Sequence, residues 1–303
     1  APLLYAAWQE VGYLKECPIT NLRLITSDLE GHPTPRLPFV DCATGSLGQG
    51  LAIATGMAWA GKYLDKSDYM TYCILGDGEC AEGSNWEACN LAAHYNLNNL
   101  VGIVDLNRLG QSQATNLGHD IDNVQARFSS FGWNTIVVDG HSISDLCKAF
   151  WNARQNTEKP TMIIAKTYKG YGMGDTISDK DNWHGKPMSQ QMCDQICKNL
   201  ESNLQNSNVK LSPKMPSAEA QALSDIAFGQ EQVKLTSPPS YGPEDKIATR
   251  KAYGTALTKL SSNRIVCADG DTKNSTFSLD FMKVFPDRFI ECFIAEQLIA
   301  GVI

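Results

Sequence analysis

The sequence predicts an α/β protein built on a doubly wound parallel sheet, followed by a truncated second α/β domain. From about Val40 to Thr167, helical stretches alternate with short β-rich runs, which is typical of parallel strands joined by crossover helices. The candidate strands are apolar or β-branched, as strands buried on both faces of a sheet should be. With 303 residues, 43% of them hydrophobic, the chain can form about two cores.

Four short runs are the candidate strands of the sheet. They are Met70–Leu75, Leu100–Asp105, Thr135–Val138 and Thr161–Ala165. We expect crossover helices at Ser84–Tyr95 and Ser144–Arg154. Ser84 and Glu87 have the spacing of a capping box, in which each side chain bonds to the other residue's backbone at the start of a helix. The second helix is opened by a serine, which is a favoured N-cap residue.

The composition divides the chain into three parts. Residues 1–200 form the first predicted domain, with an incomplete N-terminus. Residues 201–245 are rich in Ser, Asn, Pro, Gln and Lys, which indicates an interdomain linker. Residues 246–303 begin a second domain, with a helix at Thr249–Leu260 and strands at Arg264–Ala268 and Arg288–Ile294. This last part is too short to cover both faces of a sheet.

Charge and cysteine usage exclude several classes of protein. The net charge is −7 and no Lys/Arg cluster occurs, so neither nucleic acid nor a membrane surface is an expected partner. No apolar run is as long as the roughly 18 residues that a transmembrane helix needs. The ten cysteines are scattered without a regular framework, which favours reduced thiols and a cytoplasmic protein.

Polar residues follow the first two candidate strands. The first strand runs into Gly76-Asp77-Gly78, and the second runs into Leu106-Asn107-Arg108-Leu109. In a right-handed βαβ unit both strand ends lie at the same sheet edge, where open α/β folds bind ligands. A carboxylate, an amide oxygen and a backbone carbonyl are hard oxygen ligands suited to Mg²⁺, whose remaining ligands can come from a diphosphate and water. The sequence therefore predicts a magnesium-diphosphate cradle from Gly76 to Asn107.

A simple glycine turn is the alternative interpretation of Gly76-Asp77-Gly78, with Asp77 capping the next helix. Short glycine motifs alone do not separate the two interpretations, but Asn107 at the end of the very next strand favours the cradle. A dinucleotide site would instead require G-x-G-x-x-G after a strand. The run Gly45–Gly50 has a different order of glycines.

Gly76-Asp77-Gly78 with Asn107 at this distance resembles the signature of enzymes that use thiamine diphosphate. Five further runs, in the same order along nearly the whole chain, resemble transketolases of the animal type. They are Thr44–Gly50, Asp105–Ser112, Trp183–Pro187, Asp245–Gly254 and Ala295–Gln297. The resemblance implies the thiamine diphosphate-binding fold, in which residues 1–200 bind the diphosphate and residues 246–303 begin the pyrimidine-binding domain.

The resemblance also implies a reaction and its partners. Transketolases of the pentose phosphate pathway reversibly transfer a two-carbon ketol unit from a ketose phosphate to an aldose phosphate. Sugar phosphates are therefore the expected substrates and thiamine diphosphate with Mg²⁺ the expected cofactors, with Ca²⁺ or Mn²⁺ as alternative metals. Because the family's cofactor lies between two subunits, a homodimer is expected.

Metal and cofactor roles carry over residue by residue. Asp77, Asn107 and the backbone carbonyl of Leu109 match the family's metal ligands. The matches to cofactor contacts are Gly45, Ser46, Leu47, Gly78, Asn107, Lys169, His184 and Glu296. Taken alone, Lys169 would be interpreted as a solvated surface lysine.

Catalytic and substrate roles carry over in the same way. Glu296 matches the glutamate that hydrogen-bonds the aminopyrimidine ring and shares a proton with it. His184 and His32 match histidines of the substrate channel, where imidazoles can relay protons near neutral pH. His184 also matches a substrate contact, and Arg250 and Ser275 match the residues that hold the substrate phosphate.

Two alternatives stay open. One is another thiamine-dependent ketol transferase, such as a dihydroxyacetone synthase or a deoxyxylulose-phosphate synthase. The other is a catalytically inactive relative that binds the cofactor or a partner. The run Leu298–Ile303 departs from the family's usual continuation after Ala-Glu-Gln, and the family has further residues before Ala1 and after Ile303. We therefore expect a partial chain, with activity in the complete protein.

Overall fold

The computed structural model describes residues 2–12, 14, 19–204, 233–260 and 262–303. The chain forms two compact units. The first unit comprises residues 1–46 and 206–265, and the second comprises residues 47–205 and 266–303. Most of the predicted linker, 201–245, is formed by residues 205–232, which are outside the described residues. Cys17, one of the ten cysteines, is outside them as well. The predicted domain boundaries stay a prediction.

Within the described residues, the two chain segments of the first unit form three helices. They are α1 (Pro2–Glu10), the 3₁₀ helix η1 (Ile19–Asn21) and α8 (Thr249–Leu257). Tyr5, Leu14, Leu29 and Leu37 are buried together, and the Tyr5 hydroxyl donates a hydrogen bond to the Glu30 carbonyl at 2.9 Å. Helix α8, which was predicted to extend from Thr249 to Leu260, ends at Leu257.

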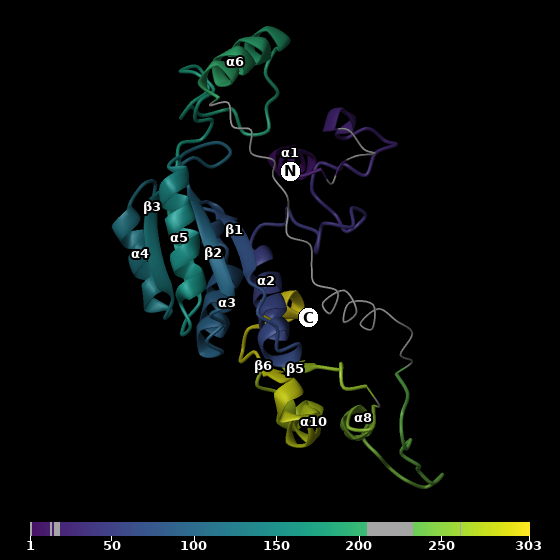
Figure 1. The fold of residues 1–303 in the computed structure, drawn as a ribbon. Coiled ribbons are helices and arrows are strands. Elements are labelled where there is room, and N and C mark those ends of the chain that lie inside the picture. Colours follow the sequence, from purple (N-terminus) through teal and green to yellow (C-terminus); the bar gives the residue numbers. More distant parts are fainter. Residues whose placement is uncertain (1, 13, 15–18, 205–232, 261) are drawn as a thin grey trace. The chain divides into compact units, whose positions relative to one another are not determined.

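The second unit is built around a parallel sheet of four strands (Figure 1). The strands are β1 (Thr71–Gly76), β2 (Leu100–Leu106), β3 (Asn134–Asp139) and β4 (Thr161–Lys166). Their order is β1-β2-β4-β3, and all neighbours are parallel. The central strands β2 and β4 are buried almost throughout, whereas the edge strand β1 alternates between buried and exposed residues. The parallel α/β fold class is confirmed.

Helices cover both faces of this sheet, as a doubly wound fold requires. On one face, α2 (Gly50–Trp59), α3 (Gly83–His94) and α4 (Ile121–Ser130) pack against the strands in one apolar cluster. On the other face, α5 (Ile143–Gln155) packs against β2 and β4 through Ala149 and Ala153. The π-helix η2 (Ala60–Leu64) extends α2, and α6 (Gln190–Asn203) follows the loop after β4. Among the helices of the described ranges, none has the length and apolar character that a membrane crossing requires.

The predicted helix caps were wrong in detail. Ser84 and Glu87 do not form a capping box, since Glu82 is the N-cap of α3 and no side chain caps that helix. The Ser84 hydroxyl donates to the Gly48 carbonyl at 2.6 Å, and Glu87 accepts a hydrogen bond from the Leu298 N–H at 3.1 Å. The N-cap of α5 is Ser142, not Ser144.

Residues 266–303 add a small second sheet to this unit. The parallel strands β5 (Cys267–Asp269) and β6 (Phe289–Glu291) are shorter than the predicted runs Arg264–Ala268 and Arg288–Ile294. The helices of this segment are α9 (Lys273–Thr276), α10 (Ser278–Val284), η4 (Pro286–Arg288) and α11 (Glu296–Val302). The buried Asp269 carboxylate organises the segment by accepting hydrogen bonds from the hydroxyls of Thr272, Thr276 and Ser278.

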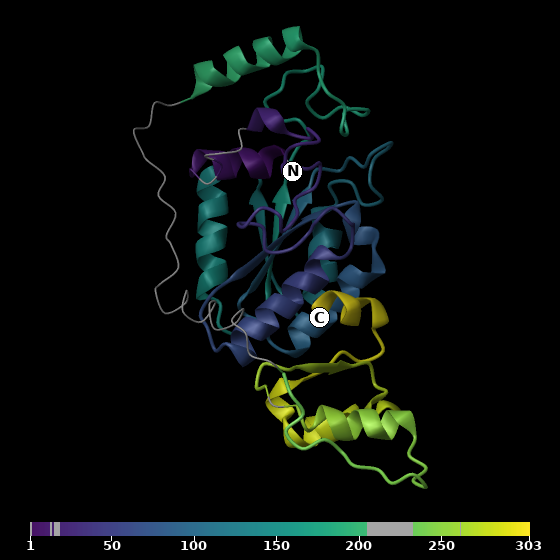
Figure 2. The ribbon, with the colours of Figure 1, turned by 90° about the vertical axis from the view of Figure 1, so that its right-hand side faces the viewer.

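Helix α11 lies directly against α2, as Figure 2 shows near the C-terminus. A methyl group on Gly56 of α2 would come within 2.2 Å of the Val302 carbonyl oxygen of α11. Likewise, one on Gly301 would lie 2.5 Å from the Ala52 Cβ. The two helices can therefore approach this closely because glycine occupies both contact points.

The change Gly56→Ala tests this contact. Alanine favours a helix interior by about 1 kcal/mol, but here its Cβ would overlap backbone atoms of α11, and overpacking costs about 1–3 kcal/mol. We expect a net loss of stability, measured as a lower urea midpoint. The control is Gly83→Ala in α3, whose added methyl would meet nothing within 4 Å. A Gly56→Ala protein as stable as Gly83→Ala would contradict the close packing.

Candidate functional site

The carboxyl ends of β1 and β2 lie side by side, because Gly76 pairs with Asp105 in the parallel register. The loop after β2 folds back on itself, with the Thr115 N–H donating to the Arg108 carbonyl at 2.8 Å and a bridge between Leu109 and Ala114. The turn after β1 and this loop therefore meet at one edge of the sheet.

Asp77 joins the two segments through its carboxylate. One oxygen, Oδ2, accepts hydrogen bonds from the Arg108 N–H at 2.6 Å and from the Thr115 hydroxyl at 3.3 Å. The other, Oδ1, accepts from the Gly78 N–H at 2.8 Å. A backbone donor from each loop thus bonds to the same side chain, and the expected convergence of the two strand ends is present.

The electrostatics of this edge favour a cation. Burial raises the pKa of Asp77 above its usual value, although its three hydrogen-bond donors act in the opposite direction, and the nearby Asp105 raises it further. Asp105 accepts hydrogen bonds from the Asn107 amide at 3.2 Å and from the Thr167 hydroxyl. A positive ion would stabilise the ionised form of the partly desolvated Asp77 carboxylate.

Asn107 and Leu109 lie in the loop that Asp77 holds. The Asn107 Oδ1 accepts a hydrogen bond from the Leu109 N–H at 3.1 Å. The Lys169 ammonium lies 3.2 Å from the Leu109 carbonyl oxygen and 3.0 Å from that of Gly110, so these carbonyls already contact a cationic group. Carboxylate, amide and carbonyl oxygens are the atom types that Mg²⁺ prefers. Within the described residues, however, no cluster of three or more His, Cys, Asp or Glu side chains is placed to hold a metal ion.

Lys169 also brings the loop after β4 to the site. Its Nζ lies 3.0 Å from the His184 Nδ1. Lys169 is half-buried and engaged in three contacts, whereas His184 is exposed. The structure therefore brings five predicted residues into one connected group: Asp77, Asn107, Leu109, Lys169 and His184.

The Arg108–Asp179 ion pair is a second link between these loops. Its nitrogen and oxygen are 2.7 Å apart, and the Asp179 N–H donates to the Lys169 carbonyl at 2.7 Å. Both Arg108 and Asp179 have positive φ values, 63° and 59°, which are uncommon for residues with side chains. This pair, like Thr115 and Thr167, could not be predicted from the sequence, because no spacing rule connects positions so far apart.

Two other predicted residues meet in the first unit. Gly45 has a φ of 119°, and a Cβ there would lie 2.4 Å from the His32 Cδ2. Only glycine fits this turn, because both its conformation and its contact with the imidazole exclude a side chain. Ser46 is exposed at the end of the first segment of this unit, and Leu47, the first residue of the second unit, is 65% exposed.

The other predicted residues lie on separate elements. Arg250 is exposed in the first turn of α8, in the first unit. Ser275 in α9 and Glu296 at the start of α11 are exposed as well. Within the described residues, no hydrogen bond connects Ser275 or Glu296 to the group around Asp77. Their assigned roles stay predictions.

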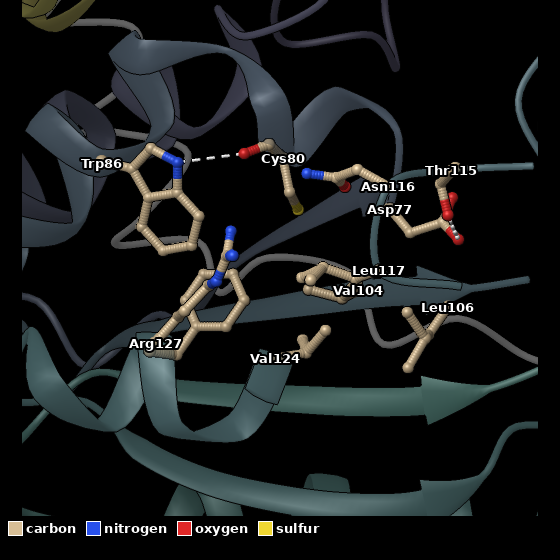
Figure 3. A pocket seen from close by; sticks show the side chains of 11 residues that line it. Asp77, Cys80, Trp86, Val104, Leu106, Thr115, Asn116, Leu117, Val124 and Arg127 are labelled. Atoms are coloured by element: carbon tan, nitrogen blue, oxygen red, sulfur yellow. Dashed lines mark hydrogen bonds between the residues drawn. The ribbon is translucent and has the colours of Figure 1, made fainter. Parts of the chain in front are cut away.

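An apolar pocket backs the Asp77 carboxylate on the side of α3 and α4 (Figure 3). The rings of Trp86 and Phe128 line it with centroids 5.1 Å apart, and the Trp86 indole donates to the Cys80 carbonyl at 3.0 Å. Burial raises the pKa of the Cys80 thiol to about 12. Asp77 itself lines this pocket and is half-buried.

The Cys80 thiol should therefore resist alkylation. At pH 8, a pKa of about 12 leaves about one molecule in ten thousand as the reactive thiolate. We expect iodoacetamide to label the exposed Cys147 of α5 long before Cys80, as followed by peptide mass spectrometry. In urea the two rates should converge. Equal rates in the folded protein would show that the pocket is open to solvent.

Comparisons with known proteins identify the family of the chain. The family profile of the transketolase thiamine diphosphate binding domain matches residues 1–211. Transketolase-like protein 2 from Homo sapiens is 54% identical over 304 residues, which cover 100% of this chain and 47% of that protein. Transketolase from Mus musculus is 55% identical over 299 residues, covering 98% of this chain and 46% of that protein.

A solved structure shares the fold. A transketolase from Pichia stipitis in complex with xylulose-5-phosphate has a TM-score of 0.73 at 21% identity, over 99% of this chain and 52% of that one. The chain thus spans about half the length of the relatives it matches. The matched residues 1–211 are most of the chain and include the sheet and the group around Asp77. The chain belongs to the transketolase family and carries its thiamine diphosphate binding domain.

Proposed function

We propose that this chain is the cofactor-binding part of a thiamine diphosphate-dependent transketolase. The complete protein would reversibly transfer a two-carbon ketol unit from a ketose phosphate to an aldose phosphate. The observation that carries the proposal is the contact of the Asp77 carboxylate with the loop of Asn107 and Leu109 at the carboxyl edge of the sheet. This is the edge at which open α/β sheets bind ligands.

The diphosphate end of the cofactor would be held by metal and backbone. Asp77, Asn107 and the Leu109 carbonyl would ligate Mg²⁺, or Ca²⁺ or Mn²⁺ in its place. The exposed Gly78 leaves room for a phosphate oxygen near the backbone, and the backbone of residues 45–47 would add further contacts. When bound, the cofactor supplies a nucleophilic carbon, and the chain orients it and keeps the diphosphate charge neutralised.

Lys169 and His184 would contact the cofactor, and His184 and His32 would line the substrate channel. Lys169 is fixed on the Leu109 and Gly110 carbonyls and lies against His184. Metal binding at Leu109 would compete with the ammonium for this carbonyl oxygen, leaving Lys169 available to an anionic ligand. His184 and His32 would hydrogen-bond sugar hydroxyls and move protons near neutral pH.

Three further assignments complete the proposal. Glu296 would hold a proton at the cofactor's aminopyrimidine ring. Arg250 and Ser275 would bind the substrate phosphate through a guanidinium fork and a hydroxyl. Their exposure in the structure leaves all three side chains accessible to a ligand. A homodimer, a cytoplasmic location and a place in the pentose phosphate pathway belong to the same proposal, as does the use of sugar phosphates such as the one bound to the Pichia stipitis enzyme.

Two other functions stay open for the complete protein. It could be a different thiamine-dependent ketol transferase, which donor and acceptor profiling would identify. It could also bind the cofactor without catalysis, and the similarity to a transketolase-like protein as well as to transketolase keeps this alternative relevant. Cofactor binding without any ketol transfer would favour that alternative.

The change Asp77→Ala in the complete protein tests the cradle. It removes the proposed metal ligand and the acceptor of the Arg108 N–H. Mutating a residue that only supports a metal ligand typically lowers metal affinity about 10–100-fold. Because Asp77→Ala removes a proposed ligand itself, we expect at least about a 100-fold loss of Mn²⁺ and thiamine diphosphate affinity. Electron paramagnetic resonance of Mn²⁺ and titration calorimetry provide the two measurements.

The matched control is Asp139→Ala. Asp139 ends β3 at the same edge of the sheet, and its carboxylate accepts a hydrogen bond from the His141 N–H at 2.9 Å. This change should leave both affinities within about twofold of the unaltered protein, since surface substitutions outside a site have small effects. Equal cofactor affinity in the Asp77→Ala and Asp139→Ala proteins would overturn the cradle assignment.

A further inference from the structure

Glu79 connects the Gly76–Gly78 turn of the cradle with Gly48, which lies just before α2. It opens η3 (Glu79–Ala81), two residues after Asp77. Its Oε1 accepts a hydrogen bond from the Gly48 N–H at 2.9 Å, and its Oε2 accepts one from the Gly76 N–H at 3.0 Å. One carboxylate therefore bonds both to Gly48, which lies just before α2, and to the end of β1.

Gly48 is held from its other side as well. Its carbonyl accepts a hydrogen bond from the Ser84 hydroxyl at 2.6 Å. It has a φ of 80°, and a Cβ there would lie 2.6 Å from the Glu82 Cβ and 2.7 Å from the Ser84 Oγ. The peptide groups of Gly48 are thus fixed between η3 and the start of α3, at a distance that only glycine permits.

The backbone of Glu79 is fixed in turn. Its carbonyl accepts a hydrogen bond from the amide of Asn85, a residue of α3 that is 1% exposed. Asp77 and Glu79 belong to the same short turn, but their carboxylates have different partners. Asp77 accepts from Arg108 and Thr115 of the loop after β2, whereas Glu79 accepts from the glycine run before α2. The two carboxylates thereby align three chain segments on one turn.

The hydrogen-bond partners of Glu79 argue against a direct contact of this residue with the cofactor. Each of its two oxygens already accepts a backbone N–H, so the negative charge is compensated by donors and is not directed at an anionic ligand. A carboxylate in direct contact with a diphosphate would weaken its binding. Glu79 is therefore suited to set the geometry of the site and not to touch the cofactor.

We propose that Glu79 is a positioning residue that fixes the spacing between Gly48 and the Gly76–Gly78 turn, and so sets the affinity for thiamine diphosphate. This inference rests on the proposed function. Without the carboxylate, the Gly48 and Gly76 N–H groups lose their acceptor and the two segments can separate. The cofactor then has to restore their spacing on binding, which lowers its affinity.

Two variants of the complete protein test the proposal. Glu79→Gln keeps the size of the side chain and one acceptor oxygen, but turns an amide NH₂ toward one of the two N–H groups. Glu79→Ala removes both acceptors. At saturating Mg²⁺, we expect the dissociation constant of thiamine diphosphate to rise about tenfold in Glu79→Gln, equivalent to about 1.4 kcal/mol, and further in Glu79→Ala.

The rate at saturating cofactor separates positioning from general damage. Because both Glu79 oxygens accept backbone N–H groups and the residue is proposed to act only through their spacing, kcat of the proposed ketol transfer should recover to within about twofold once the cofactor is saturating. A merely structural role would instead lower the fraction of active protein and the unfolding temperature without changing the dissociation constant. The control Glu158→Gln, in the exposed turn before β4, should change neither quantity.

Hydrogen exchange without cofactor provides an independent readout. Peptides that contain Gly48 and Gly76 should exchange faster in both Glu79 variants than in Glu158→Gln, because their N–H groups lose their acceptor. Unchanged exchange, or unchanged cofactor affinity in a protein that binds the cofactor, would overturn the inference. If the unaltered protein does not bind thiamine diphosphate, the proposed function fails, and so does the assigned effect of Glu79 on affinity.

Discussion

The site depends on one hydrogen bond, from the Arg108 N–H to the Asp77 carboxylate at 2.6 Å. Parallel pairing of β1 with β2 brings the two strand ends to one edge, but strand pairing alone leaves the loops beyond them free to adopt many conformations. The Asp77 carboxylate restrains them, because it accepts donors from its own turn and from the loop after β2. Burial raises the pKa of Asp77 against the opposing effect of these hydrogen bonds, and a bound cation would favour the ionised carboxylate.

Much of the sheet could be predicted from sequence. The four strands were identified to within one residue at each end because β2 and β4 are buried on both faces and read as continuous apolar runs. The convergence of Asp77 with the loop of Asn107 followed from the handedness of βαβ units. The capping box was wrong because Ser84 and Glu87 bond to residues that are distant in sequence, Gly48 and Leu298, and a local spacing rule cannot anticipate such contacts.

The remaining parts of the site could not be derived from local pattern. Arg108 and Asp179 are separated by 71 positions, and their pairing depends on the path of the loop after β4. Lys169 by itself would have been interpreted as a solvated lysine, and its location on the Leu109 and Gly110 carbonyls is a tertiary feature. Glu79 differs from these, since it directly follows the Gly-Asp-Gly motif. Its acceptor role for Gly48 became visible with the fold of the turn.

The most direct measurement of the central claim is the position of the metal. A crystal of the complete protein grown with thiamine diphosphate and Mn²⁺ would locate the ion through anomalous scattering at the manganese edge. The account predicts one strong peak about 2 Å from an Asp77 carboxylate oxygen, the Asn107 Oδ1 and the Leu109 carbonyl oxygen. A manganese peak elsewhere, with thiamine diphosphate bound and the Asp77 carboxylate making only its hydrogen bonds to Gly78, Arg108 and Thr115, would contradict it.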